Sequence, residues 1–279
     1  MLQAVIFDYD GTMAPTMERQ HRWFEKYWYH PVNRDRVKGK DFPYKDFKSF
    51  MKMYQEKMAP AENVQDIYDF LNLDCNMNDF NHPVWPAYKA FSTENPAILY
   101  PGMKEAIKEI WESGQLTRNY SRNRRLRLGV NTSNSWKIVF GDLEKNGVSK
   151  YFDSYVSKEI LAQYHGNGNA GSIKKPSKIS LALAMELLDS EGEYTIHIGD
   201  TLNDLASSNK VMRLNPAHLE TLINIGVTWG YSGEGEGKEK ARSVLERGVE
   251  LSGDRRAYFN YVVDSPNQLV EIVKKHLKE

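Results

Sequence analysis

The chain has one cysteine, Cys75, among its 279 residues. An intrachain disulfide is therefore impossible, and a zinc site built from several thiolates is excluded. Net charge is also absent, because 37 lysines and arginines balance 37 aspartates and glutamates. A formal charge of zero excludes a strongly basic protein, and it gives no indication of nucleic-acid binding.

Long apolar runs are missing as well. Asp8 and Asp10 interrupt the first apolar segment, and no basic residue precedes it. No stretch approaches the roughly 18 apolar residues that favour a membrane span. We therefore expect neither a signal peptide nor a transmembrane helix, no membrane partner, and by default a soluble protein of the cytoplasm.

The length suggests about two domains, and two kinds of sequence can be distinguished. In residues 1–14 and 100–279, short apolar runs that stop at turn residues alternate with amphipathic segments. Such alternation is typical of buried strands and of helices packed on them. It predicts an α/β fold whose core is a Rossmann-like, doubly wound parallel sheet.

The same patterns predict the individual elements of this core. Strands are expected at 4–7, 126–130, 194–198, 226–229 and 258–263. Helices are expected at 103–112, 136–146, 177–189 and 239–250, and a last helix is expected to begin at Pro266.

Residues 15–99 differ from the rest of the chain, because they are rich in aromatic and charged residues and are cut by prolines. Segments 17–29 and 45–58 carry apolar residues at helical spacing, which predicts short helices. We interpret 15–99 as an all-helical domain inserted into the α/β core. Its aromatic residues at 23, 24, 27 and 28 are better explained by helix packing than by a substrate site.

The ends of the predicted strands carry polar residues suited to chemistry. Ligands of doubly wound sheets bind where the carboxyl ends of the strands meet, so we expect these residues to lie together. They supply carboxylates, hydroxyls and an ammonium group from three strand ends and one loop: Asp8, Asp10, Thr132, Ser133, Lys175, Asp200 and Asp204.

Carboxylates gathered at one place repel one another and raise one another's pKa. Hard oxygen ligands at close quarters favour Mg²⁺, which neutralises them. A lysine and a hydroxyl beside a metal-bound carboxylate make a site for a phosphoryl group, whose phosphorus a carboxylate can attack. The residues themselves therefore indicate magnesium-dependent phosphoryl chemistry.

Four motifs also occur in a familiar order. DYDGT at 8–12 resembles the first signature of the haloacid dehalogenase-like hydrolases, Asp-x-Asp-Gly-Thr. Residues 130–133, VNTS, resemble the second, Lys175 with Pro176 resembles the third, and GDTLND at 199–204 resembles the fourth. The segments at 100–102 and 226–231 are similar to those of the phosphoglycolate-phosphatase-like branch.

The resemblance implies a role for each residue. Asp8 would be the nucleophile that forms an aspartyl-phosphate, and Asp10 would protonate the leaving oxygen and then activate water. Thr132 and the backbone N–H of Ser133 would hold the phosphoryl oxygens. Lys175 would offset the charge of Asp8 and the phosphate.

The resemblance also implies the metal ligands and the substrate class. Asp8 and Asp200 would bind Mg²⁺ directly, together with the main-chain carbonyl of Asp10, and Asp204 would be a further ligand. Residues 15–99 would form a helical cap over the site. We therefore expect a hydrolase that acts on a small phosphorylated metabolite, such as phosphoglycolate or a sugar phosphate, and no nucleic-acid partner.

Two other functions remain open at this point. A phosphomutase of the β-phosphoglucomutase type would use the same Asp8 and Asp10 but return the phosphoryl group to a sugar. A regulatory protein could bind a phosphate ligand without turning it over. The sequence also leaves open whether the chain is a monomer or a homodimer, and it assigns no role to the arginine-rich stretch 118–127 or to 233–257.

Overall fold

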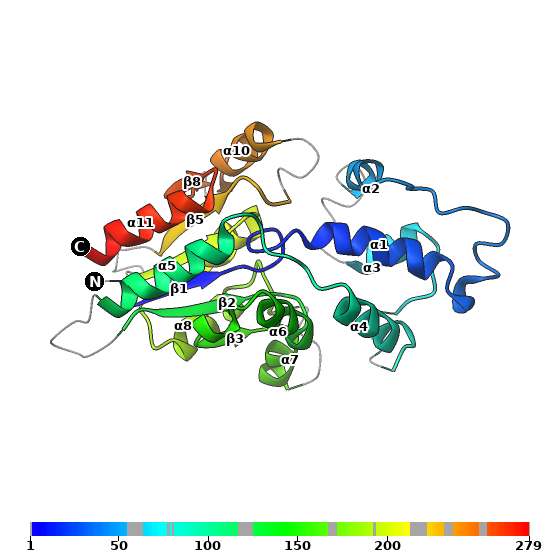
Figure 1. Ribbon diagram of the computed structural model, residues 1–279, viewed down its shortest axis with the longest axis horizontal. Coiled ribbons are helices and arrows are strands. Elements are labelled where there is room, and N and C mark those ends of the chain that lie inside the picture. The colour runs from blue at the N-terminus through cyan, green and yellow to red at the C-terminus, as the bar shows by residue number, and fades with distance from the viewer. Residues whose placement is uncertain are drawn as a thin grey trace. The chain divides into compact units, whose positions relative to one another are not determined.

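The computed structural model describes residues 2–54, 64–76, 79, 81–116, 125–166, 172–191, 194–212, 222–231, 237–250 and 256–278. The chain forms two compact units, shown in Figure 1. The core unit comprises Met1–Pro15 and Ile98–Glu279, and the helical unit comprises Thr16–Ala97.

The core unit is built on a six-stranded sheet with the strand order β3-β2-β1-β4-β5-β8. All neighbouring strands of this sheet run parallel. Its strands are β1 (Ala4–Phe7), β2 (Arg127–Asn131), β3 (Ser154–Val156), β4 (Thr195–Gly199), β5 (Ile223–Val227) and β8 (Tyr261–Val263). The parallel α/β core predicted from the alternation of strands and helices is confirmed.

The central strand β1 shows why the sequence folds this way. All four of its residues are apolar and fully buried, as expected for a parallel strand that is covered on both faces. Phe7 pairs with Val130 of β2 on one side and with Ile198 of β4 on the other. The strand that carries the first motif therefore lies between the strands that carry the second and the fourth.

Helices cover both faces of the sheet (Figure 1). Helices α5 (Met103–Leu116) and α11 (Pro266–Lys278) pack against each other, and α8 (Lys178–Leu187) packs against α9 (Leu202–Met212). The described residues of the core unit also form the helices α6 (Trp136–Lys145), α7 (Lys158–His165) and α10 (Lys238–Glu246) and the short 3₁₀ turn η3 (Ser149–Tyr151).

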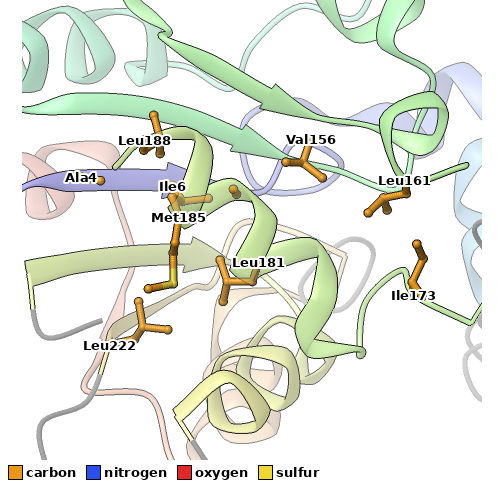
Figure 2. Close-up of a cluster of buried hydrophobic side chains, with 10 residues drawn as sticks. Ala4, Ile6, Val156, Leu161, Ile173, Leu181, Met185, Leu188 and Leu222 are labelled. Carbon is orange, nitrogen blue, oxygen red and sulfur yellow. The ribbon is translucent and has the colours of Figure 1, made fainter. Parts of the chain in front are cut away.

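Figure 2 shows the apolar cluster that fastens α8 to the sheet. Leu181 of α8 and Leu188, the residue that caps the end of this helix, belong to one cluster with Ala4 and Ile6 of β1, and all four side chains are at most 1% exposed. Burial of such side chains is the main force that holds a helix to a sheet. It fixes α8 in place, and with it the Lys175 loop that precedes the helix.

The late elements differ in part from the prediction. The expected helix 239–250 ends at Glu246, because Gly248 takes a left-handed backbone conformation with φ of +69°. Val249–Glu250 (β6) instead pairs antiparallel with Arg256–Ala257 (β7). Strand β5 also begins and ends earlier than the expected 226–229, so the loop that follows it starts at Thr228.

The described part of the helical unit contains α1 (Thr16–Trp28), η1 (Pro31–Asn33), α2 (Phe47–Met53), α3 (Val64–Phe70) and α4 (Val84–Glu94). The aromatic residues of α1 at 23, 24, 27 and 28 are all buried. Trp23 stacks on Tyr27 with ring centroids 4.9 Å apart, and its indole N–H donates to the Tyr68 hydroxyl at 2.6 Å. The interpretation of these residues as helix packing is confirmed.

Two features named from the sequence lie outside the described residues: residues 55–58 of the second predicted helix and most of the arginine-rich stretch 118–127. Within the described part of the chain, every helix is too short or too polar to cross a bilayer.

Candidate active site

The site lies where the connections of the sheet change direction. From β1 the chain moves to β2 and β3 on one side, and β4, β5 and β8 follow on the other. Ligands of open α/β sheets bind at such a switch point, beyond the carboxyl ends of the strands. Asp8 follows β1 and Asp200 follows β4, so the pairing of these strands places the two carboxylates side by side.

Asp8, Asp200 and Asp204 form a compact carboxylate cluster. Their side chains each offer an oxygen within 4.8 Å of the others, and the three residues are at most 6% exposed. Asp204 joins the two strand-end residues because it lies in the first turn of α9, one helical turn beyond Asp200. Such a set of oxygen ligands fits a divalent cation like Mg²⁺.

Lys175 is the cation that the structure brings to this cluster. Its Nζ donates to Oδ1 of Asp8 and, at 2.7 Å, to Oδ1 of Asp204. The lysine side chain is only 9% exposed, and the Lys175–Pro176 peptide bond is cis. Burial disfavours the charged lysine, but the carboxylates of Asp204 and Asp8 raise its pKa above the usual value.

One ammonium group does not neutralise the cluster. Burial raises the pKa of Asp8 to about 7, although Lys175 opposes this effect. Burial and the neighbouring carboxylates of Asp8 and Asp204 raise the pKa of Asp200 well above its usual range. Burial acts in the same direction on Asp204, but Lys175 holds the pKa of that carboxyl below its ordinary value. The uncompensated negative charge is the electrostatic signature of a cation site.

Thr12 ties the two strand ends together. Its hydroxyl lies 3.1 Å from Oδ1 of Asp200 and 3.3 Å from Oδ2 of Asp8. The turn that carries it passes through Gly11, whose φ is +84°. A Cβ at Gly11 would lie 2.3 Å from Oδ2 of Asp200, so only glycine allows this close approach.

The loop after β5 closes the other side of Asp200. The backbone N–H of Tyr231 donates to Oδ2 of Asp200 at 2.7 Å, and the indole N–H of Trp229 donates to the carbonyl of Thr12 at 3.0 Å. A Cβ at Gly230 would lie 2.3 Å from the Cβ of Asp200. This loop therefore packs directly on the first and fourth motifs.

Asp10 lies apart from the carboxylate cluster and faces the end of β2. Its Oδ2 accepts a hydrogen bond from the Thr132 hydroxyl at 3.1 Å, and its Oδ1 accepts one from the Asn134 side-chain amide at 3.0 Å. Ser133 lies between these two residues, with an exposed side chain. The structure thus brings together the ends of β1 and β2 as the motif order implied.

Asp204 is held by its own helix and by the strand beneath it. Its Oδ2 accepts from the Thr201 hydroxyl at 2.7 Å, and its carbonyl accepts from the Ser208 hydroxyl at 3.1 Å. The same hydroxyl lies 2.8 Å from Nδ1 of His197, which is buried in β4. His197 is thus a residue of the buried core.

Sequence reasoning gave no role to several residues that contact the site. Thr12 belongs to the first motif, but its position between two carboxylates depends on the pairing of β1 with β4. Trp229 and Tyr231 follow the end of β5, and this position after a strand is the sequence feature that could have indicated a place near the site. Asn134 lies two residues after Thr132, in a turn whose direction no local pattern reveals.

The family model of the haloacid dehalogenase-like hydrolases matches residues 2–211. This range covers all four motifs and most of the chain. None of the curated proteins compared with the chain matches it.

Solved structures with the same fold include three that the chain matches over nearly its whole length. CbbY from Rhodobacter sphaeroides, in complex with phosphate, is 20% identical, with a TM-score of 0.57 and 96% of each chain covered. A predicted phosphatase from Clostridium acetobutylicum is 18% identical, with a TM-score of 0.57 and 99% of each chain covered. A predicted phosphoglycolate phosphatase from Haemophilus somnus is 14% identical, with a TM-score of 0.59 and 97% of each chain covered.

Identities this low establish the shared fold alone, whereas the family model covers well over half of the chain and includes every motif. The chain therefore belongs to the haloacid dehalogenase-like hydrolases.

Proposed function

We propose that the protein is a Mg²⁺-dependent phosphatase that hydrolyses a small phosphomonoester through an aspartyl-phosphate on Asp8. The observation that supports this most directly is the buried cluster of Asp8, Asp200 and Asp204, which Lys175 contacts. A nucleophile, a cation site and a fixed positive charge are the parts that phosphoryl transfer to a carboxylate requires.

In the first step, a carboxylate oxygen of Asp8 attacks phosphorus and the bond from phosphorus to the ester oxygen breaks. The protonated carboxyl of Asp10 gives its proton to the departing oxygen, so the alcohol leaves neutral. The phosphoryl group is then bonded to Asp8, and Asp10 is a carboxylate.

In the second step, the Asp10 carboxylate takes a proton from a water molecule as the water oxygen attacks phosphorus. The bond from phosphorus to the Asp8 oxygen breaks, which releases inorganic phosphate and restores both carboxyl groups. One acid thus serves as general acid and then as general base.

Thr132, the backbone N–H of Ser133 and Lys175 would hold the phosphoryl oxygens during both steps. The ammonium of Lys175 already lies on Asp8. A fixed positive charge at this point counteracts the repulsion between an anionic nucleophile and an anionic phosphate, and this requires no rearrangement during the reaction.

Asp8, Asp200 and Asp204, with the main-chain carbonyl of Asp10, would hold Mg²⁺. When bound, the ion neutralises the carboxylates and withdraws electron density from the phosphoryl group. The raised pKa values of Asp8 and Asp200 support a cation at this position, since burial with too little positive charge is their main cause.

We further propose that residues 15–99 act as a helical cap that selects a small substrate and excludes water from the site. The names of the similar structures suggest which compounds to test. One is a predicted phosphoglycolate phosphatase, and a variant of CbbY was solved in complex with xylulose-1,5-bisphosphate.

The test is phosphate release from a panel of small phosphomonoesters, including phosphoglycolate and sugar mono- and bisphosphates, with Mg²⁺ or with EDTA. We expect release with Mg²⁺ that stops in EDTA and in the Asp8→Asn variant. Differential scanning fluorimetry provides a second readout, because an ion that binds only the folded state stabilises it by mass action, increasingly with ion concentration. Mg²⁺ should raise the melting temperature of the wild type and not that of Asp200→Asn.

Release that persists in Asp8→Asn would contradict the aspartyl-phosphate. Absence of release across the panel would favour the phosphomutase, which is then tested with a sugar phosphate and a bisphosphate primer.

A further inference from the structure

Both oxygens of the Asp10 carboxylate are held by the turn that follows β2. The Thr132 hydroxyl donates to Oδ2 at 3.1 Å and the Asn134 amide donates to Oδ1 at 3.0 Å. Two donors on different oxygens fix the plane of a carboxylate, whereas one donor leaves it free to rotate. The orientation of Asp10 is thus set by residues outside its own strand.

The direction of the Asn134 amide is itself determined by the backbone. Its Oδ1 accepts a hydrogen bond from the N–H of Ser135 at 2.7 Å. Because that N–H can only donate, the oxygen of the amide must face Ser135 and the NH₂ group must face Asp10. The backbone N–H of Asn134 donates to the Thr132 hydroxyl at 3.0 Å, which leaves the hydroxyl hydrogen free to point at Asp10.

Glu159 anchors this turn from a neighbouring helix. Its carboxylate accepts from the Ser135 hydroxyl at 2.5 Å and from the backbone N–H of Trp136 at 2.8 Å. Ser135 precedes α6 but gives its hydroxyl to Glu159, so the glutamate caps the helix in its place. One residue earlier, the N–H of Lys158 donates to the carbonyl of Asn134 at 3.0 Å. The start of α7 thus holds the turn at three consecutive residues.

We propose that Asn134 is a positioning residue for proton transfer by Asp10, and that Glu159 holds the turn from which Asn134 acts. The inference rests on the proposed function, because it assigns to Asn134 the task of aiming the acid of that mechanism. Asn134 reaches the reaction only through Asp10, so its loss affects the proton and leaves the attack by Asp8 intact.

Because Asn134 is expected to affect proton transfer and not the attack by Asp8, its role can be tested with two kinds of ester. An alkoxide is a poor leaving group and needs the proton from Asp10 as it departs, whereas p-nitrophenolate leaves without one. Loss of a residue that merely stabilises the fold slows both substrates equally. Loss of a residue that aims the acid slows the alkyl ester selectively.

The experiment compares kcat/KM of the wild type and of Asn134→Ala on the best alkyl phosphomonoester and on p-nitrophenyl phosphate, both with Mg²⁺. This ratio reports formation of the aspartyl-phosphate, whereas its later hydrolysis also uses Asp10 and is common to both esters. We expect the variant to lose at least tenfold more activity on the alkyl ester than on the aryl ester, since general acid catalysis contributes about 10²- to 10⁴-fold. Glu159→Gln should show the same selectivity to a smaller extent. Lys137→Ala, at an exposed position of α6, should leave both rates unchanged.

Equal losses on the two esters, or no loss on either, would overturn the role of Asn134 while the wild-type activity still supports the phosphatase. A wild type that hydrolyses neither ester would overturn the proposed function, and the inference with it. Thermal melting of each variant shows whether the fold is kept, and a variant that melts normally with equal rates contradicts the proposal.

Discussion

The two units of this protein bury their polar groups in opposite ways. At the strand ends of the core unit, Asp8, Asp200 and Asp204 are buried around one ammonium group, and negative charge remains uncompensated. In the helical unit, the indole N–H of Trp23 is buried against the Tyr68 hydroxyl, and Asn33 bonds both the Tyr27 carbonyl and the Asp74 N–H. At these positions the buried polar atoms are matched by hydrogen bonds among packed aromatic side chains.

The difference shows what each region contributes. Matched polar groups within packed rings stabilise a fold, because the desolvation of each group is offset by a hydrogen bond. Unmatched buried carboxylates destabilise the fold until a cation neutralises them. A cation that binds the core unit would therefore stabilise its buried carboxylates, whereas the hydrogen bonds of the helical unit stabilise that unit itself.

The largest effect is expected from Lys175→Ala, which changes the charge balance of the carboxylate cluster in the core unit. Removal of the ammonium leaves Asp8 and Asp204 without their buried partner, which typically costs about 3 to 5 kcal/mol when a buried pair is broken. Turnover should fall by about 1,000-fold, and added Mg²⁺ should not restore it, because the lost charge neutralises the phosphoryl group. Steady-state kinetics and urea denaturation measure the two effects.

Lys174→Ala is the matched control, since this lysine precedes Lys175 in the same loop. It should retain turnover near the wild-type level. A normal rate in Lys175→Ala with a loss in Lys174→Ala would mean that the neighbouring lysine serves the phosphoryl group.

Trp23→Ala tests how much a buried aromatic ring with a matched hydrogen bond stabilises the helical unit. The substitution removes a ring that is 1% exposed and leaves the Tyr68 hydroxyl without its donor, so the free energy of unfolding should fall by about 3 kcal/mol. Phe70→Ala in the same unit should change it by less than about 0.5 kcal/mol, because Phe70 is 45% exposed.

The effect of Mg²⁺ on the melting temperature gives a second measurement on Trp23→Ala. The increase in melting temperature caused by the ion should be the same in Trp23→Ala and in the wild type, since the proposed ligands all lie in the core unit. A smaller increase in Trp23→Ala would show that the helical unit takes part in ion binding.

Glu159→Gln should produce the smallest effect, and one that depends on pH. Burial acts to raise the pKa of Glu159, but the hydrogen bonds from Ser135, Trp136 and Ser157 hold it below the ordinary 4.5. A carboxyl whose pKa is lowered by folding stabilises the protein above its unfolded-state pKa, and this contribution is lost as the pH falls. The variant should be less stable by about 1 kcal/mol at pH 7, as for a lost helix cap.

The difference between wild type and Glu159→Gln should stay constant from pH 8 to about pH 5.5 and shrink below pH 4.5, measured by urea denaturation. Glu186→Gln, at an exposed position of α8, serves as the control and should show no such trend. A difference that grows on acidification would contradict the capping role.

Much of the fold could be read from local pattern. The run Ala4–Phe7 predicted a buried strand because four apolar residues in a row suit a strand covered on both faces. The helix 239–250 was predicted too long, since the left-handed turn at Gly248 and the pairing of β6 with β7 depend on a partner strand that follows it in sequence.

The carboxylates of the candidate site could also be proposed from their positions after strands, because parallel strands end at one edge of the sheet. Asn134, Thr12 and Tyr231 could not be assigned in this way. Their contacts to Asp10 and Asp200 depend on the direction of a turn or the path of a loop, and many sequences form such turns without pointing a side chain at a carboxylate.

Local residue patterns were enough to predict the α/β class of the core, the helical character of 15–99 and the four motifs, because each depends on residue periodicity or on neighbours a few positions apart. The position of Lys175 between Asp8 and Asp204, and the joint hold of Asn134 and Thr132 on Asp10, could be learned from the folded chain alone. These contacts join residues more than twenty positions apart, and they arise only when strand pairing and helix packing bring separate loops to one point.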